Sequence, residues 1–215
     1  KGGLHIANNK VITIGREFGS GGREIGERVA KLLDIPCFDR QLVEMASEKM
    51  GVDSFHLEQV DEKALSRFLE SYWVPKRPNS VAGYGMALND GMFIVQSAII
   101  KSLVKDRPCV IVGRCADYVL RGHPACLNIF ICASMEDRVK RIMERYELGE
   151  RSAKEAIREM DKSRRQYYEK YTDRKWGDRS AHQVIFNVSL LGMENTVNAI
   201  RAMYLAMDGI DEVLE

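Results

Sequence analysis

A glycine-rich stretch near the start of the chain, residues 15–26, restricts the possible folds more than any other feature. It follows a β-branched run from Val11 to Gly15 that is typical of a buried strand. It leads into Ile25 and Val29, whose spacing is that of an amphipathic helix. Glycines let successive backbone N–H groups turn toward an anion, and the start of a helix adds partial positive charge. The stretch therefore predicts a strand, a phosphate-binding loop and a helix, against the alternative of a glycine-rich turn that binds nothing.

The alternation of strand and helix continues along the chain. Four further short apolar runs have the composition of buried strands, and segments with helical spacing separate them. This alternation predicts an α/β fold, with a five-stranded parallel sheet and helices on both faces. The expected strands are Val11–Gly15, Ile35–Phe38, Cys109–Val112, Leu127–Cys132 and Gln183–Val188. The expected later helices are residues 41–49, residues 93–104, a helix capped by Ser134, a helix that is capped by Ser152 and ends near Tyr171, and residues 193–207.

The segment from 53 to 106 is expected to be a helical insertion. Its first part has the apolar spacing of one or two helices, and residues 72–89, with two prolines and two glycines, are expected to form a loop. The helix over 93–104 carries few charges and should be buried, either internally or against a second subunit of a homodimer. In the helix capped by Ser134, Asp137 and Arg141 have the spacing of an ion pair.

Composition excludes several classes of protein. The 215 residues carry a net charge of +1, so any anion site must be built locally, and a nucleic-acid partner is not expected. No run approaches the roughly 20 apolar residues of a membrane span, and no apolar core of a signal peptide is present. The five cysteines lack zinc-ligand spacing, and the three that lie in or beside apolar runs are expected to be buried thiols in a reducing cytoplasm.

The glycine-rich stretch departs from the P-loop pattern G-x-x-x-x-G-K-[ST]. With Gly21 as the second glycine, Arg16 stands at the first glycine, Gly22 at the lysine and Arg23 at the hydroxyl position. Arg23 is expected to supply the missing cation, because a guanidinium suits phosphate oxygens. Glu17 and Glu24 are the carboxylates in reach of a metal, although Glu24 also suits the first turn of a helix. The residues expected to bind the phosphates are Arg16, Phe18, Gly19, Ser20, Gly21, Gly22, Arg23 and Glu24.

Polar clusters follow the other predicted strands at their carboxyl ends, where parallel sheets bind ligands. They are Asp39-Arg40 after the second strand, Gly113-Arg114 after the third and Asn187 in the fifth. Residues 151–175 carry nine basic and five acidic side chains, and a lid of about 147–178 is expected there. Arginines on a closing lid would stabilise a transferred phosphoryl group, and the candidates are Arg158, Arg164 and Arg165. The alternative for each is a solvated helix face.

At this point the sequence resembles the cytidylate kinase-like branch of the nucleoside monophosphate kinases. The segments that carry the resemblance are 12–25, 38–40, 110–118, 128–141 and Lys175–Asp178. The resemblance implies one P-loop kinase domain over 1–215, with the insertion, a mobile lid, ATP as phosphoryl donor, Mg²⁺ and a nucleotide acceptor. It implies that Arg114 holds the acceptor phosphate.

Two segments depart from the pattern of that branch. Cytidylate kinases have Asp-Gly-Arg-Asp at the end of the third strand, where this chain has Val112-Gly-Arg-Cys115. Asp117 is the nearest carboxylate that could take the place of the missing acids. After the second strand they continue Asp-Ser-Gly, whereas this chain keeps Asp39 and continues with Arg40.

These features together predict a cytoplasmic kinase. Arg23, Arg114, Arg158, Arg164 and Arg165 are the expected catalytic residues, and the expected acceptor site consists of Asp39, Arg40, Arg114 and Asp117. The acceptor would be a nucleoside monophosphate, cytidylate-like, or a similar small molecule. Two alternatives stay open: a nucleotide-binding or phosphate-binding module without turnover, and a kinase for a non-nucleotide metabolite.

Overall fold

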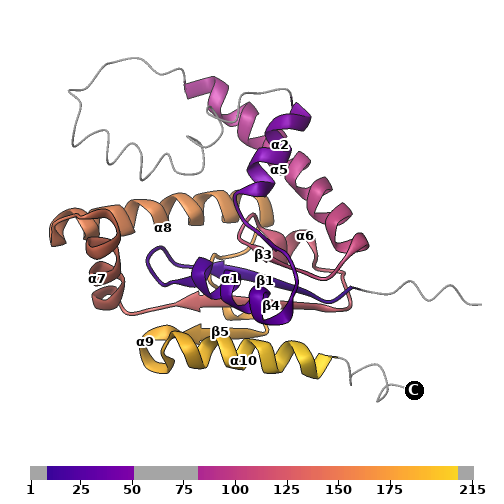
Figure 1. Cartoon of the computed structure of the whole chain (residues 1–215). Coiled ribbons are helices and arrows are strands. Elements are labelled where there is room, and N and C mark those ends of the chain that lie inside the picture. Colours follow the sequence, from indigo (N-terminus) through magenta and orange to yellow (C-terminus); the bar gives the residue numbers. More distant parts are fainter. Residues whose placement is uncertain (1–8, 51–81, 208–215) are drawn as a thin grey trace, which may run out of the picture.

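The computed structural model describes residues 9–50 and 82–207 (Figure 1). Its sheet has five strands in the order β2-β3-β1-β4-β5, and every pair of neighbours is parallel, as the sequence predicts. The first strand therefore lies at the centre of the sheet, between the third and the fourth. Its carboxyl end is at the edge where such sheets bind ligands. The strands are β1 (Val11–Arg16), β2 (Cys37–Phe38), β3 (Cys109–Val112), β4 (Cys126–Cys132) and β5 (Val184–Asn187).

Helices cover both faces of the sheet because each strand is apolar on both sides. In β1, Ile12 and Ile14 pack against α1 (Gly22–Leu33) and α10 (Met193–Ala206). Val11 of the same strand points to the other face, into a second core. That core is closed by α2 (Gln41–Met50), α5 (Ala82–Asp106) and the short α6 (Ala116–Val119). The two cores fix the sheet, and with it the edge at which the strands end.

A third, smaller core lies beyond that edge. It joins Phe18 of the loop after β1 to α7 (Met135–Tyr146) and α8 (Glu150–Thr172), where Ile142 and Ile157 are buried. Figure 1 shows these two helices packed against each other beside the sheet. The remaining elements are η1 (Arg179–Ala181) and α9 (Val188–Leu191). Within the described ranges, no helix is both long and apolar enough to cross a membrane.

The structure corrects the expected loop over 72–89 in its described part. Residues 82–89 belong to α5, which continues unbroken to Asp106 and contains the expected helix over 93–104. Further along α5, Met92, Ile99 and Ile100 are buried, and such tertiary packing outweighs the weak helix propensity of glycine. The expected helices of the first part of the insertion, and the expected loop as far as residue 81, lie outside the described residues.

One of the two predicted helix caps is confirmed. Ser134 caps α7 and accepts a hydrogen bond from the Asp137 amide at 3.2 Å. The other cap is wrong, since α8 begins at Glu150 with Gly149 as its N-cap and Ser152 is buried inside the first turn. Gly149 has an extended backbone, and its carbonyl accepts from the Ala153 amide at 2.9 Å. Two residues with capping side chains were therefore not enough to set the start of the helix.

Candidate functional site

The loop between β1 and α1 has a backbone that only glycine adopts easily. Gly19 and Gly21 have φ angles of 82° and 85°, in the left-handed region. Between them, the Ser20 hydroxyl donates to the Glu17 carbonyl at 2.9 Å. Gly21 then serves as the N-cap of α1, with no side-chain cap hydrogen bond. The loop thus places the start of a helix and its unpaired amides at the edge of the sheet, as an anion site requires.

A buried ion pair holds this loop from the lid side. The Phe18 amide donates to Asp161 Oδ1 at 2.8 Å, and the Phe18 carbonyl accepts from Arg138 Nε at 2.7 Å. Arg138, from α7, pairs with Asp161 of α8 and, at 3.3 Å, with Glu17. The Arg138 side chain is 5% exposed, so these partners replace the water that its charge has lost. Both backbone groups of Phe18 are therefore fixed before any ligand binds.

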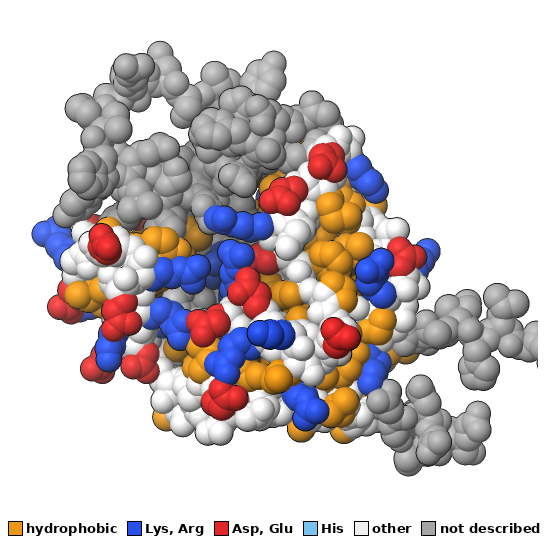
Figure 2. Space-filling view, viewed as in Figure 1, with side chains coloured by type: hydrophobic (Ala, Val, Ile, Leu, Met, Phe, Trp, Pro, Cys, Tyr) orange, Lys and Arg blue, Asp and Glu red, His pale blue; other side chains and the backbone are white. Residues whose placement is uncertain are grey.

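A cavity of about 570 Å³ opens next to the loop, at the carboxyl ends of β1, β2 and β3. Seven arginines and four acidic residues line it, so its charge favours an anion. Figure 2 shows basic and acidic side chains gathered on the face over α1 and α7. The structure brings together these sequence-predicted residues: Arg16, Glu17, Phe18, Gly19, Gly21, Gly22, Arg23, Glu24, Asp39, Arg40, Arg114, Asp117 and Arg164.

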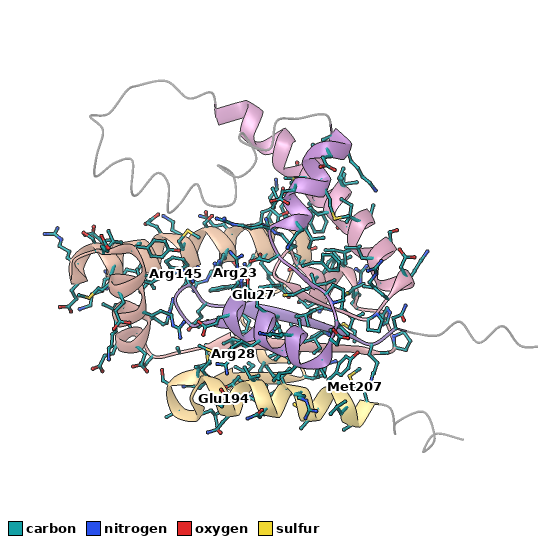
Figure 3. All side chains as sticks on the ribbon, viewed as in Figure 1. Arg23, Glu27, Arg28, Arg145, Glu194 and Met207 are labelled. Carbon is teal, nitrogen blue, oxygen red and sulfur yellow. The ribbon has the colours of Figure 1, made fainter. Side chains whose placement is uncertain are left out.

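Asp39 connects two basic residues of the loop. Its Oδ1 lies 3.6 Å from Arg16 Nη2, and its Oδ2 lies 3.5 Å from Arg23 Nε. Arg23 also donates to Glu27 at 2.9 Å, one turn further along α1, and Figure 3 shows the two side by side. The hydrogen bond to Glu27 is the main reason that the pKa of Arg23 lies above its usual value. Asp39 thus orients two guanidiniums toward the end of β2, and Asp39 and Glu27 together balance their charge.

The three lid arginines occupy different places. Arg164 lines the cavity: its Nη1 donates to the Arg16 carbonyl at 3.1 Å, and its guanidinium lies 5.5 Å from the centre of the Phe18 ring. Arg165 lies instead 5.9 Å from the centre of the Trp176 ring, outside the cavity lining. Arg158 is exposed on a separate surface of α8. A helical face holds positions four apart, which is why Met160, Arg164 and Tyr168 reach the cavity together.

On the opposite wall, Tyr168 and Gln96, which were not among the predicted site residues, join the predicted Asp117. Asp117 of α6 is buried and accepts a hydrogen bond from the Tyr168 hydroxyl at 2.6 Å. Burial, together with Asp117, raises the pKa of Tyr168 far above its usual value, so this phenol stays a donor. Gln96 of α5 also lines the cavity and is 1% exposed, and neither polar atom of its amide has a hydrogen-bond partner among the described residues.

An aromatic wall completes the cavity. The ring of Phe130 packs against Trp176 and His182, with ring centres 5.4 Å and 5.2 Å apart. His182 Nδ1 is 2.9 Å from the Asp178 carbonyl, which can only accept, so Nδ1 is the donor of this hydrogen bond. Trp176 belongs to the segment Lys175–Asp178 that carries the family resemblance. These rings exclude water from the side of the cavity beside β4.

A second hollow, of about 640 Å³, adjoins the outer side of the same loop. Ser20 lies on it, and Gly19, Glu24, Arg141 and Arg145 belong to both hollows. Arg141 donates to Glu24 at 2.8 Å, and this pair replaces the expected pair of Arg141 with Asp137. Asp137 instead accepts from the Ser134 hydroxyl at 3.1 Å, and hydrogen bonds to serines hold its pKa below the usual value.

The carboxylates expected to reach a metal are already engaged. Glu17 pairs with Arg138 and accepts from the Ala133 amide at 3.1 Å, while Glu24 accepts from Arg141. In the described part of the chain, no group of three His, Cys, Asp or Glu side chains could hold a metal ion. A Mg²⁺ site made of protein ligands alone therefore does not fit these residues, since Mg²⁺ needs near-octahedral oxygen ligands.

The sheet order, the glycine loop and the arginine-lined cavity define a fold of the P-loop kinase class. A family model places the chain within that class: residues 11–190 match the cytidylate kinase-like family, and the protein belongs to it. The family expected from the sequence is thus confirmed. No curated protein matches the sequence.

Solved structures share the fold. A crystal structure of an uncharacterized protein from Eubacterium ventriosum is similar at 25% identity, with a TM-score of 0.66 over 91% of this chain and 98% of that one. TT1252 from Thermus thermophilus is 16% identical, with a TM-score of 0.54 over 94% and 98% of the two chains. Shikimate kinase from Bacteroides thetaiotaomicron is 12% identical, with a TM-score of 0.50 over 90% and 97%. The last two likenesses concern the fold alone.

Proposed function

We propose that the protein transfers a phosphoryl group from a nucleoside triphosphate, ATP, to a small acceptor, in first place a nucleoside monophosphate. The observation that carries this proposal is the loop at the mouth of the cavity. Its amides are fixed by the left-handed backbone of Gly19 and Gly21 and by the ion pair that grips Phe18. A fixed array of donors costs no reorganisation when charge develops on a transferred phosphoryl group.

In this proposal the donor and the acceptor bind in different hollows. The phosphates of ATP would lie on the loop amides, with the nucleoside in the outer hollow beside Arg141 and Arg145. The acceptor would enter the inner cavity, with its phosphate on Arg114 and its remaining groups against Gln96 and Asp117. Arg164, already in contact with the loop, would stabilise the charge on the transferred group. Direct transfer needs positioning and electrostatic stabilisation, and no covalent intermediate.

Mg²⁺ enters the proposal only as an ion bound to the triphosphate. Bound there, it neutralises phosphate charge, as it does in kinases generally. Because Glu17 and Glu24 each pair with an arginine, no carboxylate of this chain is assigned to it. The work attributed to the protein is the placing of the two substrates and the exclusion of water.

A direct test is ADP formation from ATP, measured by a coupled assay with each acceptor of a panel. The panel contains the four common ribonucleoside monophosphates and shikimate, since shikimate kinases share the fold. We expect ADP to accumulate with one class of acceptor and not without an acceptor. An Arg164→Ala variant should lose this activity, whereas Arg151→Ala, on the exposed side of α8, should keep it. The absence of ADP with every acceptor would contradict phosphoryl transfer to these substrates.

A second candidate is a nucleotide-binding module without turnover. It is favoured by the residues at three positions: Gly22 for the lysine, Arg23 for the hydroxyl and Cys115 for the acid at the end of β3. Calorimetry separates the two functions. Tight ATP binding together with no ADP release under any condition of the panel would support the module.

A further inference from the structure

The chain departs from the P-loop pattern in opposite ways at positions 16 and 22, because one position gains a cation and the other loses one. Where the pattern has its first glycine, this chain has Arg16, and where the pattern has its lysine, this chain has Gly22. The sequence alone suggests that one cation was lost and that Arg23 takes over. The structure relates the two positions in space, because the side chain of Arg16 runs directly over Gly22.

Arg16 occupies the space in which a side chain at position 22 would begin. An ideal Cβ on Gly22 would lie 2.5 Å from Arg16 Cβ, closer than nonbonded carbon atoms approach one another, and 3.1 Å from its Cγ. The backbone of Gly22 is not the obstacle, because this residue is the first of α1 and has no positive φ. In this respect it differs from Gly19 and Gly21. Gly22 is therefore a glycine because of Arg16.

The head of Arg16 reaches the carboxyl ends of β2 and β3, inside the cavity. An ideal Cβ on Gly113 would lie 2.0 Å from Arg16 Nη1, so the guanidinium lies on the backbone at the end of β3. Asp39, at the end of β2, orients it from 3.6 Å without a direct hydrogen bond. The side chain is 17% exposed and lines the cavity, so its remaining N–H groups are directed at a partly dry site. Arg23 is more exposed, at 40%, and is held by Glu27.

We propose that Arg16 supplies the cation that binds the donor phosphates, so that the phosphate-binding cation of this loop comes from its first position instead of its lysine position. The inference rests on the proposed function and names the residue that makes the atypical loop competent. A guanidinium offers several donors in one plane and can bind two phosphate oxygens at once, which an ammonium does with less directionality. The same exchange requires glycine at position 22, where the Cβ and Cγ of Arg16 pass closest to the backbone.

The test is to reverse the exchange and to measure ATP affinity by calorimetry on the full chain. We expect Arg16→Gly to weaken ATP binding roughly 10- to 100-fold, the effect of losing charged hydrogen bonds. Gly22→Lys alone should not strengthen binding, because Arg16 blocks the new side chain. The double variant, in which the lysine has room, should recover most of the lost affinity. Arg16→Lys, which keeps the charge, should lose less affinity than Arg16→Gly.

Controls separate this inference from the proposed function. Arg28→Ala, on the outer side of α1 where Arg28 pairs with Glu194, should bind ATP as the wild type does (Figure 3). Thermal melting of each variant shows that it is folded. If the wild type binds no triphosphate, the proposed function fails and this inference with it. If the wild type binds ATP and a folded Arg16→Gly binds within twofold of it, this inference alone is wrong. A folded double variant that binds no better than Arg16→Gly also overturns it.

Discussion

Arg138 of α7 and Asp161 of α8 form an ion pair that grips the phosphate loop by both backbone groups of Phe18. The pair joins two helices of the lid side to the loop that β1 leads into. A loop held in this way does not need a ligand to reach its binding conformation, which lowers the entropic cost of binding. The shape of the anion site therefore depends on two residues outside the glycine-rich stretch.

Removing Arg138 should destabilise the protein strongly. In Arg138→Met, Asp161 would stay largely buried without its partner, and breaking a buried pair costs about 3–5 kcal/mol. We expect the free energy of unfolding, measured by urea denaturation, to fall by that amount. The double variant Arg138→Met/Asp161→Leu should be more stable than the single one, since it leaves no buried charge. A single variant within about 1 kcal/mol of the wild type would contradict a tightly held loop.

Replacing Gln96 with an apolar residue should raise the stability of the protein and weaken its binding of the acceptor. The amide is buried, and its two polar atoms lack partners within the described ranges, so its burial is costly without a ligand. Gln96→Leu should raise the free energy of unfolding by about 1–3 kcal/mol. The same variant should raise KM for the acceptor and leave KM for ATP unchanged. An unchanged KM for the acceptor would show that the amide does not contact it.

Arg164 is expected to be the lid arginine that matters for transfer. Arg164→Ala should lower kcat about 100- to 1,000-fold, the usual effect of losing one preorganised donor to a transition state. Steady-state kinetics with the active acceptor would measure it, with Arg151→Ala as the control on the exposed side of α8. Equal kcat values for the two variants would remove Arg164 from the mechanism.

The buried thiols should make the protein sensitive to alkali. Burial raises the pKa of Cys115 from 9.0 to about 12. The folded protein therefore keeps this proton after the unfolded chain has lost it, and the stabilisation is complete below pH 9 and falls as pH rises toward 12. We expect the Tm of the wild type to fall relative to the Tm of Cys115→Ala as the pH rises from 8.5 to about 10.5. A difference that does not change with pH would contradict the shifted pKa.

Local patterns in the sequence were sufficient to predict the sheet and most of the residues that line the cavity. β-branched runs and glycine-rich loops act over a few residues, so they predict the five strands and the turn at Gly19 and Gly21. The cap at Ser134 is confirmed for the same reason. At Ser152 the local pattern is equally good, yet Gly149 starts the helix, because the packing of Ala153 and Ile157 in the third core sets where α8 begins.

Contacts between distant residues were not predictable in this way. Arg141 has Asp137 at helical spacing but pairs with Glu24, 117 positions away in the sequence. Arg138 gave one signal that could have been used: it precedes Ile142 by one helical turn and so lies on the apolar stripe of its helix. A charged residue on such a stripe is buried and needs a partner, but the sequence does not say that the partner is Asp161.

The most direct test of the account is a crystal structure of the protein with a non-hydrolysable ATP analogue and Mg²⁺. We predict that the phosphates lie on the amides between Gly19 and Gly22, with the guanidinium of Arg16 in contact with them. Phosphates bound elsewhere in the cavity, or a loop left empty at saturating analogue, would contradict it.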